Sequence, residues 1–156
     1  MTGITPDPTY TGPTTADDMV FAVNFGADSA QVGDYLVADD GITAATGALE
    51  AQTQDSTYLR RGQVTTKTGT NRTFNVTGER IVGDDFQDAV LAHAIKFGKG
   101  ADVIFDYVYF NALTGKGEKG KVSVQVSDDF SGDASNMAGF TVDFNSTQAP
   151  TEYTYA

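Results

Sequence analysis

The chain of 156 residues has no cysteine, only four prolines and a single histidine, His93. The absence of cysteine excludes disulfide scaffolds, thiolate metal sites and cysteine nucleophiles. A single imidazole excludes clustered-histidine metal centres and two-histidine mechanisms. The first residues lack the basic start and apolar stretch of a secretory signal, and no apolar run approaches the roughly 20 residues of a membrane span. We therefore expect a soluble domain that is made inside the cell.

Length and composition predict one domain with an arm at each end. A chain of this size buries roughly 70% of its unfolded surface on folding, which is enough for a core without covalent staples. Residues 1–18 hold three of the four prolines among Thr, Gly and Asp, and we expect an extended N-terminal arm there. Residues 19–145 form the expected domain, and the polar residues 146–156 the C-terminal arm.

Positive charge is scarce and confined to the middle of the chain. Twenty-one acidic and ten basic residues give a formal net charge of −11. Residues 1–59 contribute −9 and residues 122–156 contribute −5, both without any Lys or Arg, whereas residues 60–121 contribute +3. Binding to duplex DNA requires several cations on phosphates, so a specific DNA-binding protein is not expected. Two interpretations remain: an acidic solubilising surface, or acidic ends of one copy that contact the basic middle of another.

Alternation of apolar and polar residues predicts several β-strands. Residues 102–113 carry large side chains on both faces, which is typical of a strand buried on two sides. A turn is expected at residues 26–29, after the first strand. The one-sided strands are expected over residues 19–25, 35–38, 122–126 and 140–144.

The segment between residues 39 and 61 is predicted to be a long loop. It is rich in Ala and Thr and has few large apolar residues, Leu49 among them. Long loops of this kind are usually functional. Thr-rich alternation over residues 63–67 and 72–81, interrupted by Gly-Thr-Asn, predicts a β-hairpin after the loop.

One helix is predicted at about residues 85–97. Asp84 or Asp85 is expected to cap it, and Gly98 to follow its last turn. The apolar face expected to pack on the sheet consists of Phe86, Val90, Ala94 and Phe97.

No constellation of residues predicts an enzyme. The segment 115–121 approaches a phosphate-binding loop but lacks the final Ser or Thr and opens a strand, so a hairpin turn is predicted. His93 is expected to pack between the helix and the sheet. Asp128, Asp129 and Asp133 could surround a calcium ion, although their spacing does not match an EF-hand, and this possibility stays open. No catalytic residue, metal ligand or cofactor is therefore assigned.

The order of these elements resembles that of a known family. A long segment, 41–61, leads into a Thr-rich hairpin that ends at residues 76–80, followed by a helix at 85–89 and an aromatic strand at 104–109. This order resembles the major tail proteins, or tail tube proteins, of long-tailed bacteriophages with siphovirus morphology. The resemblance implies a mainly β fold, a two-sheet β-sandwich flanked by one helix.

The resemblance also implies a function. Members of this family form sixfold rings that stack into a tube, and one sheet of each subunit joins a continuous inner barrel that conducts DNA into the host. The implied partners are further copies of the chain, a ruler or tape measure protein, a tail terminator, distal tail components and transient viral DNA, without a membrane. The implied location is the virion tail, assembled in the bacterial cytoplasm. The net negative charge of the chain adds the expectation of an acidic lumen, because an acidic wall repels phosphate and does not hold DNA. Contacts between subunits or rings are expected at Leu49, Tyr58, Leu59, Arg60 and Arg61.

A different function remains possible from the residues alone. An acidic β-sandwich could serve as a binding module, such as a capsid decoration protein or a saccharide-binding adhesin component. Such a module needs an exposed aromatic cluster, for which Tyr35, Tyr58, Tyr107 and Tyr109 are the candidates.

Overall fold

The computed structural model describes residues 4–25 and 35–155, so the turn expected at 26–29 lies outside the described residues. The strands are β1 (Met19–Asn24), β2 (Tyr35–Val37), β3 (Ile42–Tyr58), β4 (Gly62–Glu79), β5 (Ile104–Asn111), β6 (Lys116–Ser131), β7 (Gly139–Ser146) and β8 (Thr151–Thr154). The helices are α1 (Asp85–Val90) and α2 (His93–Lys96), with short 3-10 turns at Ala16–Asp18 and Gly100–Val103.

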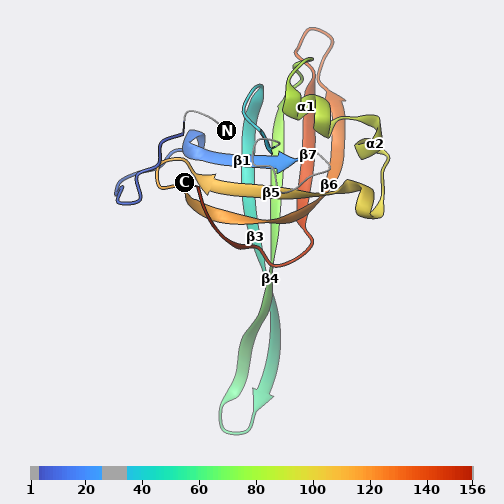
Figure 1. Cartoon of the computed structure of the whole chain (residues 1–156). Helices are drawn as coiled ribbons and strands as arrows, with labels where there is room; N and C mark the ends of the chain where they lie inside the picture. Colours follow the sequence, from blue (N-terminus) through green and yellow to red (C-terminus); the bar gives the residue numbers. More distant parts are fainter. Residues whose placement is uncertain (1–3, 26–34, 156) are drawn as a thin grey trace.

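All the strands belong to one antiparallel sheet, and the predicted mainly β fold is confirmed. The strand order is β2-β1-β5-β6-β7-β4-β3, with β8 paired to β6. Because β6 pairs with β5 through residues 117–123 and with β7 through residues 122–131, it belongs to both halves of the sheet. The sheet turns back on itself, so that β1 and β5 cross over β4 and β7 (Figure 1). The two layers expected of a sandwich are therefore two parts of a single sheet.

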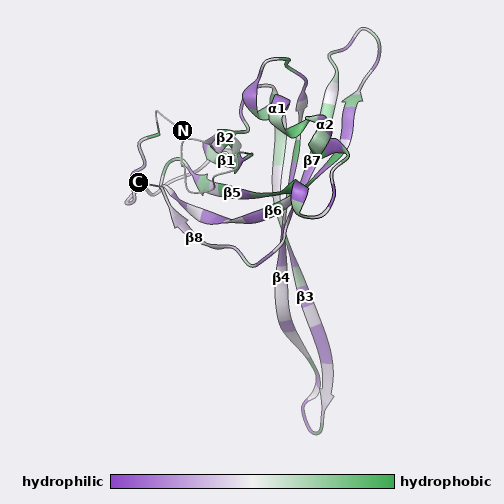
Figure 2. Cartoon of the chain, turned by 45° about the vertical axis from the view of Figure 1, so that its right-hand side comes forward, coloured by the Kyte–Doolittle hydropathy of each residue, from purple (hydrophilic) through white to green (hydrophobic). Residues whose placement is uncertain are grey.

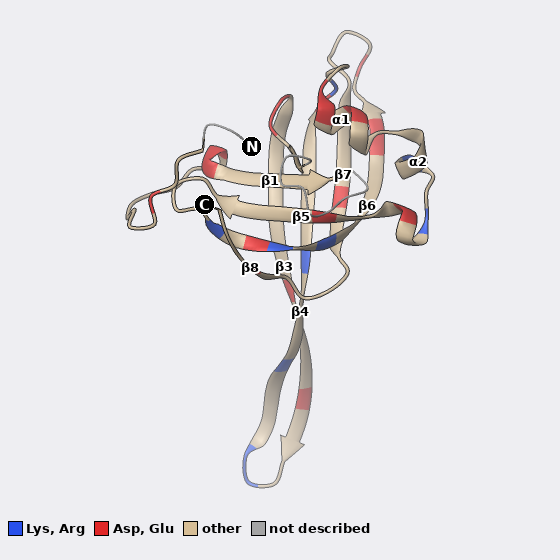
Figure 3. Cartoon of the chain, in the orientation of Figure 1, with Lys and Arg blue, Asp and Glu red and all other residues tan. Residues whose placement is uncertain are grey.

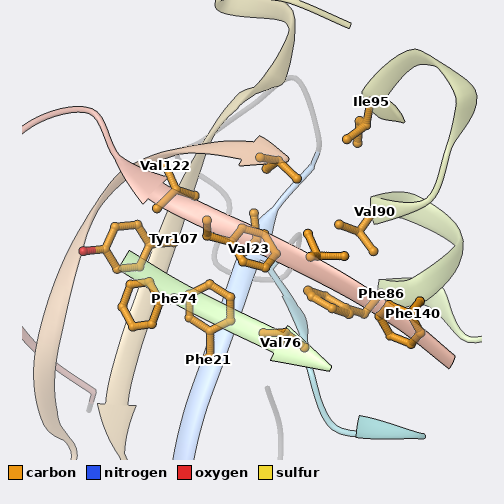
Figure 4. Packing of buried hydrophobic residues seen from close by; sticks show 13 residues of the cluster. Phe21, Val23, Phe74, Val76, Phe86, Val90, Ile95, Tyr107, Val122 and Phe140 are labelled. Carbon is orange, nitrogen blue, oxygen red and sulfur yellow. The ribbon is translucent and has the colours of Figure 1, made fainter. Parts of the chain in front are cut away.

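Aromatic and Val side chains fill the space between the two layers. Phe21 of β1 lies between them: its ring centroid is 4.6 Å from that of Phe74 on β4 and 5.0 Å from that of Phe144 on β7. Figure 4 shows this packing, with Val23, Val76 and neighbouring side chains pointing into the same space. The alternation read in the sequence corresponds to the inward faces of these strands, because each second side chain of a strand points to the same face.

β5 is buried on both faces, as predicted. Tyr107 belongs to the main core, while Val108 and Phe110 face the other way and are buried in a smaller cluster. Tyr155 stacks on Phe110, with 5.0 Å between the ring centroids. The C-terminal segment therefore packs against the domain, and β8 within it adds a short strand to the beginning of β6.

The predicted helix is divided into two. Asp84 caps α1 by accepting a hydrogen bond from the backbone N–H of Gln87 (3.0 Å). The backbone then leaves the helical conformation at Ala92, with ψ at 146°. Phe86 and Val90, both on α1, are buried in the core, as a helix packed on the sheet requires.

The division of the helix corrects the second half of its predicted apolar face. After the bend, α2 presents Ile95 to the core, while Ala94 and Phe97 are exposed. His93 is also exposed and packs against Phe97 (4.7 Å between the ring centroids) rather than between helix and sheet. The prediction failed here because it continued the helical period of α1 through the bend at Ala92, beyond which the side chains point in other directions.

A buried glutamine joins three parts of the fold. The side chain of Gln87 accepts a hydrogen bond from the backbone N–H of Ile81 (2.7 Å) and donates to the carbonyls of Asp40 (2.9 Å) and Glu79 (3.0 Å). Gly41 makes this approach possible, because a Cβ there would lie 2.6 Å from Gln87 Nε2. The turn before β3, the end of β4 and α1 are thereby held together.

The predicted loop over residues 39–61 is wrong, and so is the hairpin predicted after it. β3 is a strand of 17 residues that pairs with β4 along its whole length, and the turn between them lies at residues 59–61 (Figure 1). Gly69-Thr70-Asn71 has the composition of a turn but lies inside β4. The backbone groups of β3, for which the sequence indicates no partner, are hydrogen-bonded to those of β4.

Candidate assembly surfaces

Part of the β3–β4 hairpin extends beyond the rest of the molecule. β4 pairs with β7 only from Thr73 to Glu79, so residues 49–58 and 62–71 form a two-stranded ribbon, which we call the ribbon. Figures 1 and 2 show it projecting from the body, which holds most of the hydrophobic colouring. A strand of 17 residues spans roughly 55 Å. Isolated two-stranded hairpins are marginally stable in water, so a further partner would stabilise the ribbon.

The ribbon and the turn at its end carry the five predicted contact residues, but they do not bring all of them together. Leu59 is 94% exposed at the turn, where Tyr58, Arg60 and Arg61 are its neighbours. Arg60 has a left-handed backbone conformation, with φ at 72°, which is uncommon for a residue with a side chain. Leu49 is also exposed but lies opposite Arg72, at the other end of the ribbon. We call residues 58–61 the tip.

A buried cation that sequence reasoning missed marks the base of the ribbon. The guanidinium carbon of Arg72 lies 4.6 Å from the ring centroid of Phe74 and 5.0 Å from that of Tyr109. Its Nε is 2.7 Å from a carboxylate oxygen of Glu118 on β6. The signal available in the sequence was the position of Arg72 in the same alternating set as Phe74, which predicts that it points toward the core.

Two open edges flank four strands of the sheet, β6-β7-β4-β3. Among the described residues, β3 has no strand partner on the side away from β4. β5 stops pairing with β6 at Ser123, so the continuation of β6 toward Ser131 has β7 as its only strand partner in the described part of the chain. Proteins protect open edges with Lys, Pro or very short strands. β3 has none of these features, which favours pairing with another chain.

Where these four strands pair with one another, the face that points away from the core carries no Lys or Arg. Lys121 lies on the same side of β6, just before its pairing with β7 begins, and its Nζ is 3.1 Å from a carboxylate oxygen of Asp106. This face consists of the outward-pointing residues, every second one, of β3 between residues 44 and 52 and of β4 between residues 69 and 79. The residues that pair with them on β7, and the partners of those residues on β6, complete the face. Asp143 lies near the centre and accepts hydrogen bonds from Asn75 Nδ2 (2.5 Å) and Ser127 Oγ (2.6 Å). We call this surface the polar face. Its side chains include Thr46, Glu50, Thr73, Asn75, Thr77, Glu79, Ser123, Gln125, Asp128, Thr141, Asp143 and Asn145.

A bulge keeps one cation away from the polar face. Gln52 is opposite Gly69 and Thr53 is opposite Lys67, so Thr68 is an additional residue on β4. An additional residue reverses the alternation of the strand beyond it. Lys67 therefore shares the face of Thr53, the face that continues from the core side.

The candidates for small-molecule chemistry do not form a site. Residues 116–121, predicted as a hairpin turn, belong instead to β6 and pair with β5 from Gly117 onward, so that prediction is wrong. No helix begins at this segment of the described chain. Among the described residues, no three His, Cys, Asp or Glu side chains gather where they could hold a metal, and Asp128, Asp129 and Asp133 are included in this. The helices of the described residues are too short or too polar to cross a bilayer.

The tyrosines considered for saccharide binding do not form an exposed cluster. Tyr107 is fully buried, and Tyr109 packs against Phe74, with 5.2 Å between the ring centroids. Tyr58 is on the tip, and Tyr35 lies at the edge of the body on β2.

No family model matches the sequence, and no curated protein does so either. Solved structures are similar. A chain in the tail of an empty gene transfer agent particle, with C6 symmetry, matches with a TM-score of 0.66 and 17% identity over 92% of this chain and 100% of that one. The chain has the tail tube fold.

The tail tube fold is found in other assemblies of this kind. A chain of the native gene transfer agent virion matches with a TM-score of 0.58 and 13% identity over 90% of this chain and 98% of that one. A chain of the sheath–tube complex of an extracellular contractile injection system, PVC, matches with a TM-score of 0.55 and 10% identity over 92% and 93%. The tail tube fold therefore does not single out siphovirus morphology.

Proposed function

We propose that this chain is the structural subunit of a tail tube, in which copies form rings, the rings stack, and DNA passes through the channel. The observation that carries the proposal is the four-stranded segment β6-β7-β4-β3, which has two open edges, a core on one side and the polar face on the other. A similar chain is part of a tail with C6 symmetry, which supports rings of six.

The direction of the strands is compatible with closure into a ring. The pairs β6–β7, β7–β4 and β4–β3 are all antiparallel, so the two outer strands of the segment run in opposite directions. When copies are related by rotation about an axis along the strands, β3 of one copy meets β6 of the next copy in the antiparallel sense. Six copies with four strands each would close a barrel of 24 strands (4 × 6), and closure removes the open edges.

The polar face supplies the wall of the channel in this proposal. Its hydroxyl and amide groups offer neutral hydrogen-bonding partners, and its charged groups, including Asp143, are carboxylates. Carboxylates repel phosphate, and at physiological salt the repulsion extends only about 8 Å from the wall. DNA could slide along such a lumen without being held by it.

The remaining parts of the proposal concern partners and location. The tube would lie in the tail of a phage or phage-like particle and be assembled in the bacterial cytoplasm. Its ends would contact a tail terminator and distal tail components, and its bore would hold a ruler protein before DNA passes. The N-terminal segment, residues 1–18, and the predicted contact residues at Leu49 and the tip would link neighbouring copies, whereas β8 and Tyr155 of the predicted C-terminal arm pack on their own copy.

Negative-stain electron microscopy of the purified protein over a concentration series tests the proposal. We expect hollow tubes to form above a critical concentration, with sixfold symmetry in end-on views. A binding module would instead remain a small particle at every concentration. Protein that stays monomeric up to its solubility limit, also when it is incubated with a tape measure protein, would overturn the proposed function.

A further inference from the structure

The tip and a second exposed surface lie at opposite ends of the molecule. The loop before α1 and the loop between β6 and β7 both lie at the end away from the tip (Figures 1 and 2). The backbone N–H of Arg80 donates to the carbonyl of Ala138 (2.8 Å), which joins the two loops directly. In a stack of rings that all point the same way, opposite ends of successive copies meet, and such contacts are heterologous.

The tip is basic and apolar. Arg60 and Arg61 are exposed, and neither takes part in an ion pair with a described residue. Leu59 and Tyr58 add exposed apolar surface beside them, at 94% and 53% exposure. Residues 49–71 hold three bases and two acids, a net charge of +1, which leaves −12 for the rest of the chain.

The opposite end is acidic and apolar. Val82 is 85% exposed in the loop before α1, and Met137 is 60% exposed in the loop between β6 and β7. Asp85, the first residue of α1, and Asp133, in the loop between β6 and β7, are exposed and belong to none of the ion pairs of the described residues. Figure 3 shows acidic residues at this end and basic residues at the tip. We call the surface formed by Val82, Asp85, Asp133 and Met137 the apical surface.

The cations near the apical surface are already neutralised. Arg80 Nη2 lies 2.7 Å from a carboxylate oxygen of Asp88, and Lys96 Nζ lies 3.4 Å from one of Asp129. The unpaired charge of the surface is therefore negative, while that of the tip is positive. The tip and the apical surface both also expose large apolar side chains, which is typical of interaction surfaces.

We propose that the apical surface of one copy binds the tip of a second copy in the next ring. This inference rests on the proposed function and adds to it the surface that receives the tip. Arg60 and Arg61 face the carboxylates of Asp85 and Asp133, and Leu59 packs on Val82 and Met137. The fixed turn conformation at Arg60 lowers the entropy lost on binding, because the tip is already shaped in the free chain.

A charge exchange between two variants tests the contact. The tip variant carries Arg60→Glu and Arg61→Glu, and the apical variant carries Asp85→Lys and Asp133→Lys. Each alone places like charges at the contact, and we expect the critical concentration for tubes to rise at least about tenfold. In an equal mixture, each altered surface finds an oppositely charged partner on the other variant. We expect the mixture to form tubes near the wild-type critical concentration.

Controls separate this inference from the proposed function. Lys116→Glu with Lys119→Glu makes the same charge change as the tip variant but lies on β6 beside β8, and we expect normal tubes. Circular dichroism and thermal unfolding of each variant report on the monomer fold. If the wild type forms tubes but the mixture of variants does not, or if each variant alone assembles normally, the proposed contact is overturned and the proposed function stands. Absence of tubes from the wild type would overturn both.

Discussion

The body and the ribbon are built from the same kind of structure and are held by different forces. Both are antiparallel β-structure rich in Thr, and β4 runs through both. In the body, a second layer covers the sheet, and Phe21 contacts Phe74 and Phe144 across the space between the layers. In the ribbon, the two strands have only each other. Burial therefore stabilises the body within one chain, whereas the ribbon has no second layer among the described residues.

The largest effect is expected from removing the ring that joins the two layers. Phe21→Ala should lower the free energy of unfolding by about 3–5 kcal/mol, because it leaves a cavity among three aromatic side chains. Leu49→Ala, on the exposed ribbon, should change it by less than about 0.5 kcal/mol. Urea unfolding of both variants measures the contrast. Equal losses would mean that the ribbon is part of the cooperative fold.

The next effect concerns the polar contact in the body that joins α1 to the turn before β3 and to the end of β4. Gln87→Leu keeps the volume but leaves the N–H of Ile81 and the carbonyls of Asp40 and Glu79 without the side-chain partner. We expect a loss of roughly 2–3 kcal/mol in urea unfolding. Gln125→Leu, at an exposed position of the polar face, is the matched control and should be nearly neutral. A neutral Gln87→Leu would show that the hydrogen bonds of this side chain contribute little.

A stabilising change is expected at Tyr107. Its hydroxyl is buried and has no hydrogen-bond partner among the described residues, so Tyr107→Phe should raise the stability by about 0.5–1 kcal/mol at pH 7. Burial, followed by the negative charge of Glu118, raises the pKa of Tyr107 above its ordinary value. The folded state therefore keeps the proton that the unfolded state loses above about pH 10, and stability falls as the pH rises further.

Urea midpoints at pH 7 and pH 10.5 measure both effects of Tyr107→Phe. The advantage of the variant should grow with pH, because it lacks the buried group that resists ionisation. Tyr35 and Tyr153, whose pKa values burial also raises, remain in both proteins and cancel in the comparison. A destabilised variant at pH 7 would point to a hydrogen bond that the Tyr107 hydroxyl makes in solution.

The smallest effect on stability is expected from shortening the ribbon. Replacing residues 52–69 with Asn-Gly joins Ala51 to Thr70, which are opposite each other in the hairpin, by a favoured two-residue turn. The free energy of unfolding should stay within about 0.5 kcal/mol of the wild-type value, because the removed residues contact no second layer. Tubes should be lost, since the tip is gone. A strongly destabilised monomer would contradict the independence of body and ribbon.

The same contrast explains what could be predicted from the sequence. β1, β5 and β7 were predicted closely, because burial on one side imposes an alternating pattern, as in β7, and burial on both sides imposes large residues on both faces, as in β5. β6 was predicted only over residues 122–126, and β8 was not predicted, because their other residues are mostly polar. β3 has no buried side, so it has no such pattern and resembles a loop in composition. Its pairing with β4 follows from backbone hydrogen bonds, to which all residue types except Pro contribute both a donor and an acceptor.

Local conformation accounts for the other differences. The helix prediction was correct through Val90, where side chains pack on the core, and wrong beyond Ala92, where the backbone bends. For the candidate surfaces, the sequence provided the residues of the tip and the separation of charge along the chain. It could not provide the polar face or the apical surface, because both depend on register and on loops far apart in the sequence.

The bulge at Thr68 links the number of residues in the β3–β4 hairpin to the charge of the polar face. One residue added to β3 between Gln52 and Thr53 would pair with Thr68, restore uninterrupted alternation and turn Lys67 toward the side that holds Asp143. Six added ammonium groups would then ring the bore of a sixfold conduit and attract the polyanion that has to move through it. Natural variation in this hairpin should accordingly occur in steps of two residues, or in single steps that are compensated on the same strand.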